Sequence, residues 1–266
     1  MTMLSTPARS TTGTFDLASR LKASAIHLCI SAVIAALAAS LVFALWYPWP
    51  YRIISGGQAL FMLVLSVDLV LGPVLTFVAF NTSKTRQHLV RDLVVIAALQ
   101  LGGLVYGLYT VFLARPVAVV FEVDRFRVVP AVNVYAEELP QALPELRSLS
   151  LRGPRLLGTR DSRDGDERLK TFDLALRGVD TGVRPSYWQP YEKSRAAALQ
   201  RARPVSVLLK KYPAQAAAIQ AEIAKTGLSA EQIKFLPVLS HKADWSALLD
   251  ARNGNLVGFA PADGFF

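Results

Sequence analysis

The stretch "LFMLVLSVDLVLGPVLTFVAF", residues 60–80, is almost wholly apolar and carries one aspartate, Asp68, at its middle. A run of about 20 apolar residues is long enough to cross the hydrocarbon core of a bilayer as a helix. On translocon-based scales, an ionised carboxylate at the centre of such a helix costs about 2.5–3.5 kcal/mol. The stretch therefore predicts a transmembrane helix whose Asp68 side chain faces protein rather than lipid.

Two further stretches are long and apolar enough to cross a bilayer, and the composition of the whole chain is also typical of a membrane protein. The chain has 266 residues, of which 52% are apolar and 18% are charged, whereas soluble domains have about 25% charged residues. The predicted spans cover about 23–46, 58–80 and 92–114. The first is interpreted as an anchor because its apolar run exceeds the roughly 7–15 residues of a cleaved signal peptide.

The distribution of basic residues predicts the topology. Three basic residues precede the first span, and three lie between the second and third spans: Arg9, Arg20 and Lys22, then Lys84, Arg86 and Arg91. The first loop, by contrast, offers only Arg52. Because short cytoplasmic segments are enriched in Lys and Arg, we expect residues 1–22 to be a cytoplasmic tail. Residues 115–266 then lie beyond the membrane, in the periplasm if the membrane is the inner membrane of a Gram-negative bacterium.

Aromatic residues cluster in the first loop, directly after the first predicted span. Rings of Trp and Tyr are enriched at the two surfaces of a bilayer. We therefore expect this cluster to lie at the membrane surface on the side of residues 115–266; it consists of Trp46, Tyr47, Trp49 and Tyr51.

Residues 115–266 have an ordinary mixed composition and predict an α+β domain. Two β-rich runs flank Asp124 and Arg125, a pattern typical of two strands joined by a tight turn. Helical patterns follow, and a final hairpin turns at Asn253-Gly254; the expected helices cover 163–179, 191–202 and 213–227. We expect the strands at both ends of the domain to form one sheet with helices packed on it.

Polar and small residues form a stripe on the second and third predicted spans. At helical spacing the stripe contains Leu65, Asp68, Gly72 and Thr76, with Pro73 beside it, and Gln100, Gly103 and Gly107 on the third span. One hypothesis is an interhelical hydrogen bond between Asp68 and Gln100 within a three-helix bundle. The other is that the stripe stays open for a further transmembrane helix. His27 lies nearer the cytoplasmic end and is predicted to be a bundle or interface histidine.

The sequence contains no pattern typical of an enzyme, a cofactor site or a metal site. The acids of "DSRDGD" (161–166) lack the spacing of a calcium loop. His241 and Asp244 are close in sequence, but no serine elbow, cysteine nucleophile or second metal-type histidine accompanies them. The net charge of +9 is scattered without a nucleic-acid-reading motif. We therefore expect no catalysis, no cofactor, no metal and no nucleic-acid binding. Scattered charges of this kind usually form a solvated surface; contact with anionic lipid headgroups or an acidic partner surface is the functional alternative.

The ordered series "KASAIHL", "LWYPWPY", "SGGQALFMLVLSVDLVLGPVLTFVAF", "RDLVVIAALQ", "YGLYTVFLARPV" and "FEVDRFRVV" resembles the type IV pilin accessory proteins, the TfpX/TfpZ-like family. The resemblance runs from about residue 22 to residue 132. Asp68, Gly72 and Pro73 match the family pattern in the second span. The outer-domain motif positions are Phe121, Glu122, Asp124, Arg125 and Phe126, none with an established role.

The resemblance implies a non-enzymatic inner-membrane protein that supports pilin stability or pilus assembly. The expected partners are the major type IV pilin and the lipid bilayer, and the oligomeric state is left open. Two alternatives share the same layout: a membrane-tethered periplasmic sensor or ligand-binding protein, and a structural subunit of another envelope complex. Which pilin is served, and whether the protein acts as chaperone, assembly factor or retraction modulator, is open at this stage.

Overall fold

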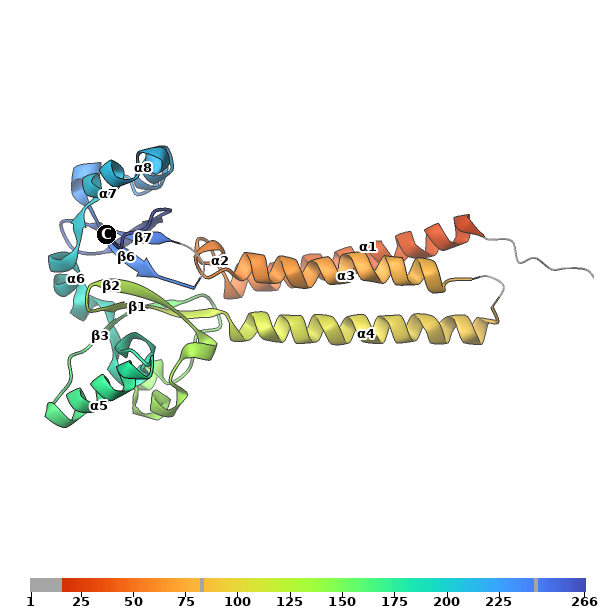
Figure 1. Ribbon diagram of the computed structural model, residues 1–266, viewed down its shortest axis with the longest axis horizontal. Helices are drawn as coiled ribbons and strands as arrows, with labels where there is room; N and C mark the ends of the chain where they lie inside the picture. Colours follow the sequence, from red (N-terminus) through yellow and green to blue (C-terminus); the bar gives the residue numbers. More distant parts are fainter. Residues whose placement is uncertain (1–15, 82–83, 242–243) are drawn as a thin grey trace, which may run out of the picture. The chain divides into compact units, whose positions relative to one another are not determined.

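The computed structural model describes residues 16–81, 84–241 and 244–266. Its described residues divide into two compact units. One is made of 16–37 and 63–107, and the other, which we call the outer unit, of 38–62 and 108–266. Residues 1–15 of the expected cytoplasmic tail, with Arg9, lie outside the described residues. The observed order of elements, three long apolar helices followed by a mixed helix-and-sheet domain, confirms the predicted fold class (Figure 1).

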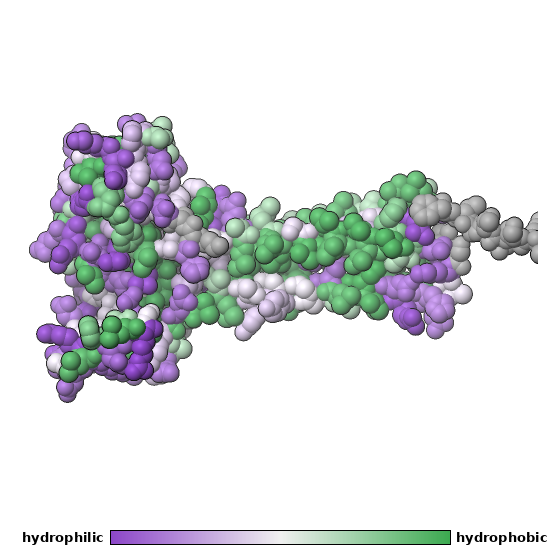
Figure 2. Space-filling view, viewed as in Figure 1, coloured by the Kyte–Doolittle hydropathy of each residue, from purple (hydrophilic) through white to green (hydrophobic). Residues whose placement is uncertain are grey.

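The three long helices are apolar enough to cross a membrane. They are α1 (Leu17–Leu41), which continues through the π-helical turn η1 (Val42–Trp46), α3 (Gly57–Ala79) and α4 (Arg86–Leu113). Both α1 and α4 begin about six residues before the expected spans, so that each has a charged first turn or two. Figure 2 shows apolar side chains covering α3 and polar side chains where α4 begins.

The outer part of the chain is built on one mixed sheet. Its strand order is β4-β3-β1-β2-β6-β7-β8, with β5 paired to β6. The strands are β1 (Pro116–Glu122), β2 (Arg125–Pro130), β3 (Arg155–Thr159), β4 (Trp188–Pro190), β5 (Arg203–Pro204), β6 (Ile233–Leu239), β7 (Trp245–Asp250) and β8 (Leu256–Ala260). Strand β2 pairs in parallel with β6, which confirms that strands from both ends of the domain share a sheet.

Helices join and cover the strands. The α-helices are α2 (Tyr51–Ile54), α5 (Gly165–Leu176), α6 (Arg195–Arg201), α7 (Val205–Lys211) and α8 (Ala216–Lys225). The 3₁₀ helices are η2 (Ala131–Asn133), η3 (Ala136–Gln141), η4 (Pro144–Leu146), η5 (Thr181–Val183), η6 (Pro185–Tyr187), η7 (Tyr191–Ser194), η8 (Pro213–Gln215) and η9 (Ala230–Gln232). The predicted helices at 163–179, 191–202 and 213–227 correspond to α5, α6 and α8.

The core lies on both faces of the sheet. All seven residues of β1 are buried, and successive strand residues point to opposite faces. Val119 and Phe121 therefore join one cluster, whereas Ala118 and Val120 join the other. A third cluster packs α7 and α8 against β6 and β7. The first cluster also includes Ile54 of α2, which is fully buried.

The connection between α1 and α3 is therefore part of the outer core. The aromatic residues of this loop were expected to lie at the membrane surface. Within the cluster, Tyr47 is fully buried and donates a hydrogen bond from its hydroxyl to the carbonyl of Val111 (2.9 Å), and Tyr51 packs edge-on against Phe259 (5.6 Å). Trp49 stays half exposed.

Candidate functional site

The second span, which contains a proline, holds the first candidate site, around Asp68. Pro73 lies inside α3 and has no N–H, so the carbonyl of Leu69, four residues earlier, loses its helical partner. At the neighbouring carbonyl, that of Asp68, the side-chain Nε2 of Gln100 donates a hydrogen bond at 3.1 Å. Gly72 makes room for this amide, because a Cβ there would overlap Nε2 of Gln100.

The Asp68 side chain itself is half buried, and Gln100 contacts the backbone of Asp68 rather than its carboxylate. Over residues 16–81, 84–241 and 244–266, we find no hydrogen bond or ion pair made by this carboxylate. A carboxylate inside an apolar span normally pairs with another group. The acid at the centre of α3 thus has no partner in the part of the chain that the structure describes.

The other predicted residues of the spans make separate contacts. His27 lies on α1, where its Nδ1 is 2.5 Å from the hydroxyl of Thr76, about two turns along α3 from Asp68. Gly107 is buried where α3 and α4 approach closely, since a Cβ there would overlap the side chain of Val64. Gly103 has no heavy atom within 4 Å of its Cβ position. Gly103 therefore does not line the contact made by Gly107.

The second candidate site is the tip of the β1–β2 hairpin, which contains the predicted motif positions. Phe121 and Phe126 pair across the strands and pack edge-on in the core, with ring centroids 5.7 Å apart. Asp124 and Arg125 form an ion pair at 2.7 Å at the tip. The guanidinium of Arg125 also lies 5.3 Å from the ring centroid of Phe265.

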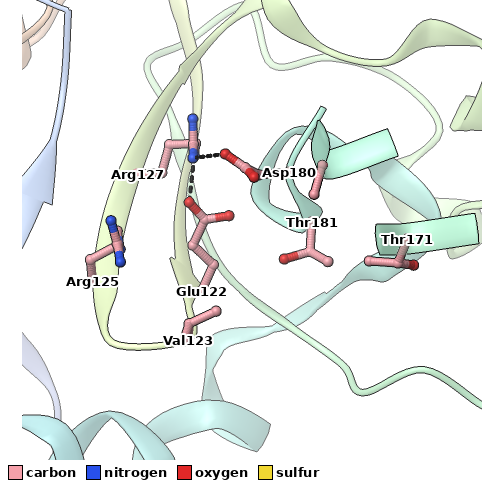
Figure 3. Close-up of a pocket in the computed structure, with 8 residues that line it drawn as sticks. Glu122, Val123, Arg125, Arg127, Thr171, Asp180 and Thr181 are labelled. Carbon is pink, nitrogen blue, oxygen red and sulfur yellow. Dashed lines mark hydrogen bonds and ion pairs between the residues drawn. The ribbon is translucent and has the colours of Figure 1, made fainter. Parts of the chain in front are cut away.

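Glu122 is buried and holds the loop of residues 180–182 against the hairpin (Figure 3). It accepts hydrogen bonds from Nε of Arg127 at 2.5 Å and from the backbone N–H of Gly182 at 2.7 Å. Arg127 also contacts Asp180 at 2.5 Å. A Cβ on Gly182 would lie 2.5 Å from the Glu122 carboxylate, so glycine is required for this approach. These bonds give Glu122 a structural role.

Val123, between Glu122 and Asp124, was not among the predicted site residues. Its φ is +54°, a conformation that is a clear outlier for a β-branched residue, and it is 70% exposed. It lines a cavity of about 290 Å³ with Thr171 and Ala175 of α5, and it also lines a second of about 580 Å³. Strained residues in this region of φ/ψ space concentrate at functional sites, and a β-branched residue inside a predicted tight turn is the signal that identifies it.

Helix α5, beside this hairpin, has its polar side inward. The carboxylate of Asp164 caps the helix by accepting from the N–H of Glu167 at 2.8 Å, and Glu167 pairs with Arg160 at 2.6 Å. Thr171 contacts the hydroxyl of Tyr187 (2.6 Å) and accepts from Arg184 (2.8 Å).

A buried carboxylate, Glu138, lies behind this helix. Burial raises the pKa of Glu138, but hydrogen bonds from Arg184 and Ser186 outweigh it and leave that pKa lowered. The contact between Arg184 and Glu138 is 2.8 Å long, and both side chains are buried. The charged pair therefore holds the inner side of the domain together.

One exposed face of α5 is apolar. Leu169, Phe172 and Leu176 share one helical face and are 70%, 65% and 74% exposed. We use the name hairpin–helix surface for these three residues together with Val123, which lines a cavity with Thr171 and Ala175 of the same helix. An exposed apolar helix face marks an interaction site more often than isolated apolar residues do.

The sequence of this chain is similar to proteins named for fimbrial assembly. A family model described as "Fimbrial assembly protein FimB" matches residues 15–56. Two fimbrial assembly proteins of Dichelobacter nodosus, of serogroup I and serogroup E1, are 37% and 36% identical over 246 residues, which is 92% of this chain and 95% of each relative. The chain belongs to this fimbrial assembly protein family.

A third fimbrial assembly protein of Dichelobacter nodosus, of serogroups C1 and C2, is 44% identical over 121 residues, 46% of this chain and 92% of that relative. No solved structure matches the chain. The family confirms the resemblance drawn from the span and hairpin motifs. Within this fimbrial assembly protein, the matched segment 15–56 comprises α1, the π-helical turn and α2.

Proposed function

We propose that this fimbrial assembly protein acts in pilus assembly by binding the pilin subunit in the inner membrane before or during assembly. Its relatives are named for fimbrial assembly, and three apolar helices precede a folded outer domain. Such a chain offers one binding surface within the bilayer and another outside it. The proposed role is binding without a catalytic step.

The proposed orientation is an N-terminus in the cytoplasm and a domain in the periplasm. Arg20 and Lys22 at the first span, and Lys84, Arg86 and Arg91 between the second and third, support it through the preference of cytoplasmic segments for positive charge. In this orientation the outer domain is on the side of the membrane where a pilus is built.

The unpartnered Asp68 carboxylate is the single observation that carries the proposal. Leaving a half-buried acid unpaired at mid-span is unfavourable, so a hydrogen-bond donor on another transmembrane helix would stabilise it. The two hypotheses from the sequence differ here: Gln100 is engaged by a backbone carbonyl, which leaves the Asp68 side chain for a partner. We propose that this partner is the transmembrane helix of pilin.

Outside the bilayer, the hairpin–helix surface supports a second contact with pilin. Its four apolar side chains are 65–74% exposed, and Val123 is held at the hairpin tip by the buried Glu122 beside it. A fixed apolar tip beside an apolar helix face suits binding to a folded partner, because little conformational entropy is lost on association.

Co-purification of pilin tests the proposal. We expect Asp68→Ala to lower the pilin recovered with the tagged full-length protein, and the number of surface pili, several-fold. Asp68→Asn retains hydrogen-bonding capacity and should lose less. Ser66→Ala is the matched control, since the Ser66 hydroxyl donates to the carbonyl of Leu63 in its own helix.

Normal pilin recovery and normal piliation in Asp68→Ala, at wild-type levels of the protein, would contradict a role for this carboxylate in pilin binding. Reduced recovery in Ser66→Ala to the same extent would show that any polar loss in α3 has this effect, and would contradict the specific role equally.

A further inference from the structure

The ends of the three apolar helices mark where the outer unit meets the bilayer surface. The π-helical turn after α1 ends at Trp46, α3 begins at Gly57, and α4 ends at Leu113. Residues joined directly to these ends are held near the lipid headgroups by the chain itself, whichever side of the membrane the domain occupies. This placement requires only that the helices span a bilayer, and it is independent of pilin binding.

The loop after α1 places an aromatic residue and two cations together. Trp49 is 52% exposed. The guanidinium of Arg52 lies 4.9 Å from its ring centroid, and the ammonium of Lys225, at the end of α8, lies 6.0 Å from it. Nε of Arg52 is buried without a hydrogen-bond partner in the described part of the chain.

A second loop, residues 149–153, reaches the same boundary. A Cβ on Gly153 would lie 2.7 Å from Cγ of Pro48, so this loop packs against the connection after α1. Arg115, two residues after α4, donates from Nε to the carbonyl of Ser150 at 3.2 Å. The loop therefore presents Leu151, which is 59% exposed, and the exposed Arg152.

The segments that adjoin the ends of the three helices at the outer unit carry only positive charge. The sequence contains no acid in 46–57, 108–115 or 149–155, whereas these segments contain four arginines. Arg152 makes no ion pair within residues 16–81, 84–241 and 244–266. Lys225 pairs with Glu222 at 2.7 Å but remains 61% exposed.

We propose that Trp49, Arg52, Leu151, Arg152 and Lys225 form a headgroup rim that binds anionic phospholipid headgroups at the bilayer surface. The three cations would contact headgroup phosphates, while Trp49 and Leu151 enter the boundary between headgroups and acyl chains. The rim selects phosphatidylglycerol over zwitterionic lipid because cations near an anionic leaflet surface are attracted to it.

Electron paramagnetic resonance with spin-labelled lipids tests the rim. The full chain is reconstituted in phosphatidylcholine nanodiscs, and the motionally restricted fraction is measured for spin-labelled phosphatidylglycerol and for spin-labelled phosphatidylcholine. We expect the wild type to prefer phosphatidylglycerol, and Arg52→Gln/Arg152→Gln/Lys225→Gln to lower that preference by about threefold or more at low salt.

Two matched variants make the result decisive. Arg163→Gln/Arg168→Gln/Lys210→Gln removes the same charge from exposed positions outside the rim and should keep the preference. Arg52→Lys/Arg152→Lys keeps the rim charge and should retain most of the preference for phosphatidylglycerol. A wild type without preference, or equal losses in the rim and control variants, would overturn the proposal.

Discussion

At the scale of single residues, Pro73 explains the polar contact between α3 and α4, because it leaves the carbonyl of Leu69 without a helical partner and the neighbouring carbonyl, that of Asp68, accepts from Gln100. An interhelical hydrogen bond between Asp68 and Gln100 was one of the two hypotheses from the sequence, and the structure brings these residues together through a backbone carbonyl. The acceptor is a carbonyl beside the one that Pro73 leaves without a helical partner, and helical spacing alone does not specify which oxygen an amide will contact. Val123 was missed because the φ of one turn residue depends on the pairing register around it.

Gly103 and Gly107, one turn apart on α4, should differ in how much an alanine substitution destabilises the protein. Gly107→Ala should lower the free energy of unfolding by about 1–3 kcal/mol, because the new Cβ would overlap the stiff β-branched side chain of Val64. Gly103→Ala meets no atom within 4 Å and should leave that free energy unchanged or slightly higher. Unfolding in mixed micelles of increasing SDS content compares the two, and equal destabilisation would contradict the close helix contact.

At the scale of elements, periodicity and turn residues predicted the long helices, the β1–β2 hairpin, α5, α6, α8 and the β7–β8 hairpin. The short strands β3, β4 and β5 were not predicted, since two to five residues are too few to show an alternating pattern. Helix α5 was predicted correctly, but its polar inner face follows from tertiary contacts with Arg160, Tyr187 and Arg184.

Acid should weaken the anchoring of α5 through Glu167. The hydrogen bond from Arg160 lowers the pKa of Glu167 from 4.5 to about 2. A carboxyl whose pKa is lower in the folded state stabilises the fold above its ordinary pKa and loses that contribution as the pH falls toward the folded value. Wild type should therefore be more stable than Glu167→Gln at about pH 6, and the difference should shrink between about pH 4.5 and pH 2.

Thermal unfolding of the full chain in detergent at a series of pH values checks this. Asp166→Asn is the neighbouring control, because Asp166 is exposed and forms no ion pair in the described part of the chain. A stability difference for Glu167→Gln that is independent of pH would contradict the ion-pair account.

At the scale of the whole molecule, three apolar spans followed by an α+β domain were predictable from composition and length. The packing of the α1–α3 connection into the core of the outer unit could not be predicted from composition and length. The apolar and aromatic character of residues 46–54 suits a membrane surface and a protein core equally well. The sheet that covers Ile54 places that residue in the core, whereas Trp49 stays half exposed.

Adjacent isoleucines in α2 test this packing. Ile54 is fully buried in the sheet core, whereas Ile53 is 38% exposed. Ile54→Ala should lower the free energy of unfolding of the outer unit by about 2–5 kcal/mol, as expected for a cavity in a packed core, and Ile53→Ala should lower it far less. Limited proteolysis of the outer unit in detergent-solubilised protein measures both, and equal resistance would contradict a core role for α2.

Site-specific photocrosslinking in cells that make the native pilin would show whether the pilin helix lies beside Asp68. A photoreactive residue replaces Leu71, three positions after Asp68 on the same helical side, or Val70, which points away from it; the two are 50% and 58% exposed. Pilin binding at Asp68 predicts a pilin adduct from position 71 and little or none from position 70. Absence of an adduct at position 71, or equal adducts at both, would contradict the account.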